Sequence, residues 1–387
     1  MLKFTIDSKE LKTMIDKSVA ILNKKALISS LTKLYFKIET DGILKILGTD
    51  LTDFEHYVEI RSANAWNIIP GEFGIDIDDL KVIIKMNGNI TIEDISIKSD
   101  YKIKVICGNK TVTIPKYEDK NVTLPFLNDT EECILTVKEA WLLDTVTNLF
   151  FYTSNKEHKT YPVHQSFNFN TKNKRVEALN DYMIGIRTLD EKDINKENDN
   201  LILHNICVPI FKKILNKKSL ENIKLLQDNR YIKAQGNDFT YITKRIKGTY
   251  LDVEKFLTKD YKYSFNVNRK NILSIMKYNY DLLKGFDKIP VILYNKNNKL
   301  YAYFKTKKYK VVDIIETENM HMNANLHIGF NPYYLANIFN IIDVDNPICK
   351  GIDNKSPLFI YGKKYMFFIM SMYLKTEVIE EMKQSIN

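Results

Sequence analysis

Cysteine is scarce in this chain and poorly placed for cross-linking. The 387 residues include four cysteines, which are far apart and form no C-x-x-C pair. A disulfide framework or a zinc site built from paired thiolates would need close, regular cysteine spacings. We therefore expect reduced thiols with a structural role at Cys107, Cys133, Cys207 and Cys349.

Long hydrophobic runs are also missing. No apolar stretch approaches the roughly 18 to 20 residues that span a bilayer. The segment from Met1 to Asp7 places charge inside any would-be apolar core of a signal peptide. The sequence therefore predicts a cytoplasmic protein with no membrane partner.

Familiar catalytic motifs are absent. The sequence contains no G-x-x-x-x-G-K-[ST] phosphate loop, no G-x-G-x-x-G, no H-E-x-x-H and no G-x-S-x-G. The six histidines include no pair at metal-ligand helical spacing, and we interpret His158 and His164, on either side of Pro162, as loop residues. We expect no catalytic residues, no metal and no cofactor, and thus a protein that is not an enzyme.

One acidic cluster leaves a rival interpretation open. Asp50, Asp53 and Glu55 could hold a divalent cation, as in a metal-dependent enzyme that acts on nucleic acid. A two-metal site would need a second carboxylate cluster, and none stands out. Because Asp181 recurs in an equivalent turn of the chain, we favour a turn-forming role for these aspartates.

The chain does contain a pattern that returns three times, about every 130 residues. Each copy has an alternating strand that leads into an amphipathic helix, then a short helix with one apolar face, then a hairpin with glycine at its turn. Such order at one period indicates an internal repeat. The longer helices are marked by Leu11 and Ile15, Leu142 and Val146, and Ile272 and Met276, the short helices by Leu80, Phe211 and Leu335, and the turns by Gly108, Gly236 and Gly362.

The period predicts three domains, each large enough for its own hydrophobic core. Turn-rich or polar segments near residues 128 and 259 suggest domains at 1–128, 129–258 and 259–374, followed by an extension at 375–387. Between the landmarks the dominant period is two, with a hairpin folded at Asn295 to Asn298. Each domain should therefore be α+β, mostly antiparallel sheet with two helices.

The net charge of +9 points to a polyanionic partner such as nucleic acid, although the abundance of Lys, Asn and Ile also fits a nucleotide-composition bias. Any single lysine is most simply part of a solvated helix face. Basic helices repeated across the domains are what a surface that tracks phosphates needs. The basic residues on or beside the helices are Lys9, Lys12 and Lys17, Lys81 and Lys85, Lys212, Lys213, Lys217 and Lys218, and Arg269, Lys270 and Lys277.

Several segments carry a family resemblance through their order and spacing. They are Lys3-Phe4-Thr5-Ile6 with the helix behind it, Gly48-Thr49-Asp50-Leu51, Ile328-Gly329-Phe330-Asn331 with a helix from Tyr333 to Ile341, and a terminal strand from Phe368 to Leu374. Together with the threefold repeat, they resemble the bacterial DNA polymerase III beta subunit, the beta sliding clamp. The resemblance covers nearly the whole chain.

The resemblance implies a DNA-clamp fold and a non-catalytic role in DNA replication. Clamps of this family are homodimeric rings, with antiparallel sheets outside and helices that line a central hole for double-stranded DNA. They act as processivity factors that tether the replicative DNA polymerase, and they bind the clamp loader and repair proteins through short peptide motifs. The positions that correspond to DNA-contacting residues are Lys25, Lys156, Lys159 and Tyr161.

The same resemblance implies an apolar peptide pocket between the second and third domains. Methionine and aromatic side chains suit a groove that accepts several peptides, although many of them could instead fill an interdomain core. The corresponding positions are Pro162, Leu179, Asp181, Tyr182, Met183, Ile184, Leu251, Lys255, Phe256, Phe368, Met370, Ser371, Met372 and Tyr373.

The pocket positions depart from the usual pattern. The family usually has Thr-Asp-Gly-His-Arg-Leu at Leu179 to Ile184, proline at Leu251, and Met-Pro-Met-Arg at Met370 to Tyr373. We expect the pocket to persist, but the standard peptide motif to fit it less well. A diverged accessory clamp of a plasmid or virus, with the same fold and private partners, therefore remains an alternative.

Ring closure should pair an edge strand of the first domain with one of the third. By resemblance, Val112 and Ile114 lie opposite Leu282 and Leu283, unless these residues fill their own cores.

The extension at 375–387 carries Val378, Ile379 and Met382 at helical spacing. We expect either a frayed terminus or a helix at the pocket mouth that competes with partner peptides.

Overall fold

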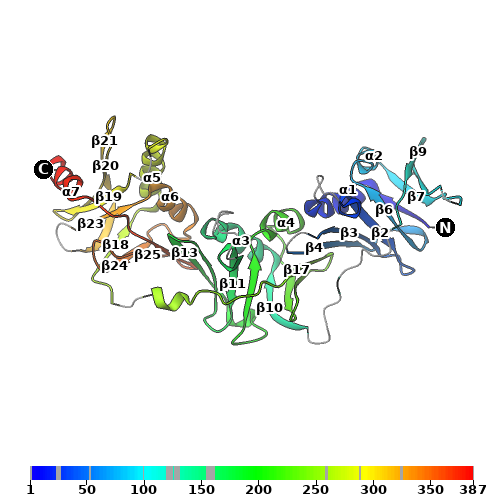
Figure 1. Cartoon of the computed structure of the whole chain (residues 1–387), viewed down its shortest axis with the longest axis horizontal. Helices are drawn as coiled ribbons and strands as arrows, with labels where there is room; N and C mark the ends of the chain where they lie inside the picture. The colour runs from blue at the N-terminus through cyan, green and yellow to red at the C-terminus, as the bar shows by residue number, and fades with distance from the viewer. Residues whose placement is uncertain are drawn as a thin grey trace. The chain divides into compact units, whose positions relative to one another are not determined.

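The chain forms two compact units in the computed structural model, which describes residues 2–22, 28–51, 54–98, 100–118, 125, 131–153, 162–257, 260–286, 289–322 and 326–386 (Figure 1). Unit 1 comprises Met1–Val146 and Asp190–Lys247, and unit 2 comprises Thr147–Leu189 and Gly248–Asn387. This division falls inside the second predicted domain. The domain boundaries stay predictions, and the residues at 128/129 and at 258/259 lie outside the described ranges.

Unit 1 is built on two antiparallel sheets. In the larger sheet, strands of the first and second repeats join through β4 and β17, where Val58 pairs with Tyr241. The smaller sheet has the order β5 (Trp66–Ile69), β1 (Lys3–Asp7), β7 (Asn89–Asp94), β8 (Lys102–Cys107) and β9 (Lys110–Pro115). The larger has the order β10 (Glu132–Lys138), β15 (Asn222–Gln227), β16 (Tyr231–Gln235), β17 (Phe239–Lys244), β4 (His56–Ser62), β3 (Leu44–Asp50), β2 (Lys33–Ile38) and β6 (Gly71–Asp76).

The first helix shows why these segments fold locally as predicted. The Asp7 carboxylate accepts hydrogen bonds from the first backbone amides of α1 and so caps the helix. Leu11 and Ile15 are fully buried where α1 packs on β3 and β4. A Cβ atom at Gly48 of β3 would lie 2.8 Å from the Ser18 carbonyl oxygen, so this close approach requires glycine. The helices here are α1 (Ser8–Ser18), α2 (Leu80–Ile84), α3 (Glu139–Leu149), which runs into unit 2, and α4 (Cys207–Ile214); β14 (Asn200–His204) precedes α4.

Unit 2 repeats this plan. Strands of the second and third repeats join through β13 and β26, where Gly185 pairs with Phe367. Its larger sheet contains β11 (Ser166–Asn170), β12 (Arg175–Leu179), β13 (Met183–Thr188), β26 (Tyr365–Ile369), β25 (Leu358–Tyr361), β24 (Ile348–Gly351), β18 (Tyr263–Val267) and β22 (Thr317–His321) in that order. Its four-stranded sheet has the order β21 (Lys310–Ile315), β20 (Lys299–Lys305), β19 (Val291–Lys296) and β23 (His327–Phe330).

The helices of unit 2 are also capped by residues that the sequence supplies. The side chain of Asn268 accepts hydrogen bonds at the start of α5, and that of Asn331 does so at the start of α6, where Pro332 takes the first helical position. The helices are α5 (Arg269–Leu283), α6 (Pro332–Ile341) and α7 (Thr376–Ser385). All three repeats therefore show the predicted strand, long helix, short helix and hairpin, and the α+β prediction is confirmed.

Turn chemistry follows the sequence prediction. Gly108 between β8 and β9 has φ of 56°, and Asn297 and Asn298 between β19 and β20 have φ of 53° and 56°. Glycine and asparagine tolerate this left-handed region, which tight hairpin turns demand. The predicted hairpins at Gly236 and Gly362 also form, between β16 and β17 and between β25 and β26.

The C-terminal segment differs from its prediction. The last strand, β26, ends at Ile369 rather than continuing to Leu374. The chain then forms α7, whose Met382 is fully buried against Ile292 and Tyr303 of β19 and β20, with Val378 and Ile379 packed beside it (Figure 1, red helix). The predicted apolar helical face is confirmed, and a frayed terminus is wrong.

The structural thiols expected from the sequence are found for Cys107, Cys207 and Cys349, which are buried and free, while Cys133 is half-buried and free. None of the helices in the described ranges combines the length and apolar composition needed to cross a membrane.

Candidate functional site

All fourteen predicted pocket residues belong to unit 2. They are carried by β12, β13 and the turn between them, by β26 and the segment after it, and by the short helices η4 (Pro162–Gln165) and η6 (Val253–Phe256) with the residues before η6. Ile184 pairs directly with Phe368 in the ladder between β13 and β26. The Phe256 ring meets the Phe368 ring edge-on, at 6.2 Å between centroids, so η6 lies on this side of the ladder.

Exposure divides the predicted pocket into two groups. Leu179, Met183, Ile184 and Phe368 are buried, so they form the floor and the sheet core rather than a contact surface. The second group is large, apolar and exposed, and we call it the apolar rim. It consists of Tyr182 (55% exposed), Leu251, Phe256, Met370 (42%) and Tyr373 (84%).

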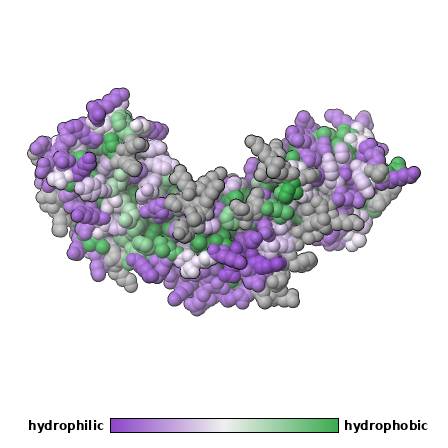
Figure 2. All heavy atoms as spheres, in the orientation of Figure 1, coloured by the Kyte–Doolittle hydropathy of each residue, from purple (hydrophilic) through white to green (hydrophobic). Residues whose placement is uncertain are grey.

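The apolar rim is an unusual surface, because apolar side chains from three separate segments remain exposed in one part of the unit. Figure 2 shows hydrophobic residues, in green, over the region of β13 and β25. Asp181 and Lys255 are exposed polar residues of the predicted set, whereas Pro162 is only partly exposed. An apolar groove with a few polar neighbours is suited to a short peptide with apolar anchors.

Hydrogen bonds hold the segment that carries Met370 to Tyr373. The Met370 amide donates to the Tyr182 carbonyl oxygen at 2.9 Å, and the Met372 amide donates to the Gly329 carbonyl oxygen of β23 at 2.8 Å. The Ser371 hydroxyl donates to the Lys355 carbonyl oxygen at 2.5 Å. Tyr373 therefore projects from a segment with a fixed backbone. The buried face of α7 packs on β19 and β20, not on β13 or β26, so its competition with partner peptides stays a prediction.

The predicted DNA contacts, Lys25, Lys156, Lys159 and Tyr161, lie outside the described residues and stay predictions. Among the helix lysines, Lys12 of α1, Lys212 and Lys213 of α4, and Lys270 and Lys277 of α5 are exposed. Lys17 and Lys81 instead form ion pairs, at 2.7 Å with Asp238 and 2.6 Å with Asp78. The sequences of α3 and α6 contain no Lys or Arg, so the basic character is uneven.

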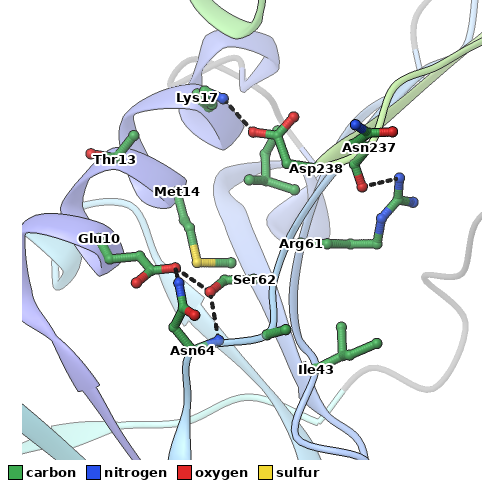
Figure 3. A pocket seen from close by; sticks show the side chains of 12 residues that line it. Glu10, Thr13, Met14, Lys17, Ile43, Arg61, Ser62, Asn64, Asn237 and Asp238 are labelled. Atoms are coloured by element: carbon green, nitrogen blue, oxygen red, sulfur yellow. Dashed lines mark hydrogen bonds and ion pairs between the residues drawn. The ribbon is translucent and has the colours of Figure 1, made fainter. Parts of the chain in front are cut away.

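A polar cleft of about 480 Å³ lies between α1, β4 and the turn that joins β16 to β17 (Figure 3). Its basic groups are engaged within the unit: Lys17 pairs with Asp238, and Arg61 donates to the backbone carbonyl oxygens of Gly236 and Phe239 at 3.0 and 2.9 Å. This network fastens the second repeat to the first. It accounts for Lys17, which the sequence had suggested as a phosphate contact.

In the described part of the acidic cluster, Glu55 is engaged by a lysine and a tyrosine. Glu55 accepts hydrogen bonds from the Lys244 ammonium at 2.8 Å and the Tyr231 hydroxyl at 3.0 Å. The hydrogen bond from Lys244 is the main cause that lowers the pKa of Glu55. Asp53 lies outside the described residues, and among those that are described no three His, Cys, Asp or Glu side chains gather to hold a metal ion.

The predicted ring-closing residues are only partly available at the surface. Ile114 and Leu283 are buried in their own unit, whereas Val112 and Leu282 are half-buried. Two apolar residues that sequence reasoning missed, Val312 and Ile314 (56% exposed), lie on β21, which is the edge of the four-stranded sheet. Their alternation with polar neighbours marks a two-faced strand, but the sequence alone does not reveal that the strand is an edge.

Comparison with known proteins relates the whole chain to one group. No family model matches the chain. The chain is 19% identical over 374 residues to the beta sliding clamp of Lactococcus lactis subsp. lactis, covering 92% of this chain and 94% of that protein. It is 20% identical over 381 residues to the beta sliding clamp of Helicobacter pylori, covering 93% and 94%.

Solved structures give the same result for the fold. The crystal structure of a putative DNA polymerase III beta subunit from Eubacterium rectale matches with a TM-score of 0.85 and 16% identity, covering 97% of this chain and all of that one. The resemblance read from the sequence is thus confirmed. In sequence the chain is similar to bacterial beta sliding clamps, and its fold is that of the DNA polymerase III beta subunits.

Proposed function

We propose that this protein is a DNA sliding clamp, which encircles duplex DNA as a ring of two copies and tethers a replicative polymerase. The observation that carries the proposal is the match in fold and order to beta sliding clamps over nearly the whole chain. Within each unit, strands of successive repeats join edge to edge, β4 with β17 in unit 1 and β13 with β26 in unit 2, as a ring built from repeated domains requires. The function needs no catalytic group.

The mechanism is topological. A closed ring cannot leave a DNA duplex sideways, so it does not need tight phosphate binding. Exposed lysines such as Lys12, Lys212 and Lys277 would make weak, exchangeable contacts that permit sliding. A polymerase bound to the ring is then held near the DNA at high effective concentration.

The apolar rim is the proposed docking site for partner peptides. Phe256 and Met370 offer exposed apolar surface above the buried Phe368, which suits aromatic or aliphatic anchors of a peptide. The exposed Tyr373, where the family usually has arginine, favours a peptide that is less acidic at this end. We propose that the polymerase, the clamp loader and repair proteins dock here.

Two sheet edges are the proposed closing surfaces of the ring. Within the described residues, β9 and β21 each end a sheet with one unpaired side. β9 carries Val112, and β21 presents Val312 and Ile314. Pairing of β9 from one copy with β21 from the next would give hydrogen-bond partners to the backbone groups of both edge strands and bury these side chains.

Measurement of mass in solution tests closure. Wild-type protein should sediment near twice 45.4 kDa, whereas Ile314→Asp, which places a charge in the proposed interface, should sediment as a monomer. Leu220→Asp is the matched control, because Leu220 is an exposed aliphatic residue away from both edges. A monomeric wild type, or equal behaviour of the two variants, would contradict this interface.

A further inference from the structure

The edge strand β21 carries a carboxylate on the face of its sheet that packs against the core. Asp313 lies directly opposite Ala302 of β20, which is fully buried. Its neighbours on the same face of β21 are Val311, opposite the buried Phe304, and Ile315, which is itself buried. Within the described residues β21 ends the four-stranded sheet of unit 2 (Figure 1). Asp313 therefore lies between the core and the open edge of the sheet.

The polar groups at this position lack hydrogen-bond partners. Asn279 of α5 is fully buried, and neither its amide nitrogen nor its amide oxygen makes a hydrogen bond to a described residue. The Oδ2 atom of Asp313 is buried and likewise has no partner within the described part of the chain. Burial raises the pKa of Asp313, and the nearby Asn279 amide offsets part of this rise. Because a buried polar group without a partner is costly, native structures usually supply one.

The helix α5 is fixed against β21, which keeps Asn279 and Asp313 together. The Asn271 Oδ1 atom of α5 accepts a hydrogen bond from the Glu316 amide, directly after β21, at 3.0 Å. Met276, one turn before Asn279, is fully buried. A partner for both side chains can reach them from the open edge of β21. A cation suits both, because a carboxylate and an amide oxygen are hydrogen-bond acceptors.

The other proposed closing edge, β9, presents a suitable cation. Cys107 of β8 is buried, and Lys110 of β9 lies directly opposite it, so Lys110 is on the core face of its own sheet. Lys110 is exposed. The alternation of the strand places Lys116 on the same face, but Lys116 is buried and already pairs with Asp94 at 2.8 Å. Lys110 is therefore the lysine of this edge that is available to a second copy.

We propose that Lys110 of one copy reaches across the open edge of β21 in the next copy, pairs with Asp313 and donates to the Asn279 amide oxygen. In an antiparallel pairing of β9 with β21, this contact places Val112 opposite Val311, so apolar side chains continue the interface. A slip of two residues would instead place Val112 opposite Asp313 and separate the two charges. The pair therefore sets the register of the joined strands, as single buried polar contacts do elsewhere. This inference rests on the proposed ring and adds the residues that select its register.

Sedimentation of complementary charge reversals tests the proposal. Lys110→Asp and Asp313→Lys each bring like charges together at both interfaces of a two-copy ring. Each variant alone should therefore associate at least about 100-fold more weakly and sediment near 45.4 kDa. When the two variants are mixed in equal amounts, a ring with one copy of each has opposite charges at both interfaces, so the mixture should sediment near twice that mass. Lys212→Asp, the same change at an exposed residue of α4, is the matched control and should associate as wild type does.

The outcomes separate this contact from the ring itself. With a dimeric wild type, a mixture of folded variants that stays monomeric, or single variants that associate as wild type does, would overturn the pairing of Lys110 with Asp313 alone. A monomeric wild type would overturn ring closure and this contact with it. If circular dichroism shows that Asp313→Lys does not fold, Lys110→Gln and Asp313→Asn decide. Each should weaken association about 30-fold, and the double variant no more than either one. Losses that multiply in the double variant would overturn the proposal.

Discussion

The two junctions between repeats share a backbone pattern but differ in surface chemistry. At the β4–β17 junction the Lys244 amide donates to the Phe54 carbonyl oxygen at 2.8 Å, and at the β13–β26 junction the Met370 amide donates to the Tyr182 carbonyl oxygen at 2.9 Å. Lys244 and Met370 are separated by the same interval as the hairpin glycines Gly236 and Gly362. The two bonds are therefore equivalent positions in successive repeats.

What surrounds these bonds is opposite in character. At the β4–β17 junction the side chain of Lys244 pairs with Glu55, which also accepts from Tyr231. At the β13–β26 junction the residues in the equivalent places, Met370 and Tyr182, are exposed and carry no charge. The comparison indicates that one junction is closed by polar contacts, whereas the other is open to an apolar partner. Four experiments test this difference between the junctions.

The largest expected effect is a loss of stability on acidification, confined to the β4–β17 junction and its surroundings. Burial lowers the pKa of His56 on β4 and of His204 to about 4, against about 6.5 in an unfolded chain. Below pH 6.5 the unfolded chain binds protons that the folded chain excludes until about pH 4. The stability that the neutral histidines contribute is therefore full above pH 6.5 and is lost as pH falls toward 4.

Each histidine should cost about 2 kcal/mol at pH 5, because each pKa unit corresponds to about 1.36 kcal/mol. Urea denaturation with hydrogen exchange should show the loss in β4 and β17 and not in β13 and β26. His321→Gln is the control, because His321 is exposed. Equal loss of protection at both junctions would contradict this assignment.

The next largest effect concerns α7, a helix that packs on the unit containing the open junction. Met382→Ala should lower the free energy of unfolding of unit 2 by about 3 kcal/mol, because it leaves a cavity against Ile292 and Tyr303. Lys383→Ala, on the exposed side of the same helix, should change it by less than about 0.5 kcal/mol. Similar effects of the two changes, measured by denaturant titration, would show that α7 is not docked as described.

A direct test truncates the side chain at the equivalent position of each junction and compares the effect on polymerase binding. Met370→Ala should weaken binding of the replicative polymerase of the same organism about 30-fold, since truncation of an interface anchor costs about 2 kcal/mol. Lys244→Ala, at the equivalent position of the closed junction, should leave the affinity unchanged. Surface plasmon resonance with both variants measures the difference. An equal loss in the two variants would remove the distinction between the junctions.

The smallest effect on stability is expected for the ion pair between Lys244 and Glu55 at the β4–β17 junction. Glu55→Gln should leave the urea midpoint nearly unchanged, because Lys244 is largely exposed and water screens the interaction. High salt should erase any residual difference from wild type. A large destabilisation that persists in high salt would mean that this pair holds the junction together, rather than merely covering it.

Local features of the fold could be predicted from the sequence because neighbouring residues determine them. Asp7, Asn268 and Asn331 cap helices through side-chain oxygens, and Gly108 permits a left-handed turn, wherever the rest of the chain lies. Because the pattern recurs in three repeats, the local signals for helices and turns could be compared between copies. The end of β26 at Ile369 was missed because it depends on where the next residues find partners, on Tyr182 and on β23.

The candidate site was less predictable, because exposure depends on which strands meet. Met183 and Tyr182 are adjacent in sequence, yet the first is buried in the ladder and the second is exposed. Ile314 was missed because only the pairing of strands makes β21 an edge. The contact between the rings of Tyr280 and Tyr333 was missed because they come from helices that are far apart in the sequence.

Topological retention on DNA is the most direct test of the central claim. The protein is loaded onto nicked circular duplex DNA with the clamp loader of the same organism, and the amount bound is measured by gel filtration before and after one restriction cut. A ring around the duplex should stay on the circle in high salt and leave once the DNA is linear. Retention that is unaffected by linearisation, or loss from the intact circle in high salt, would contradict a ring around the duplex.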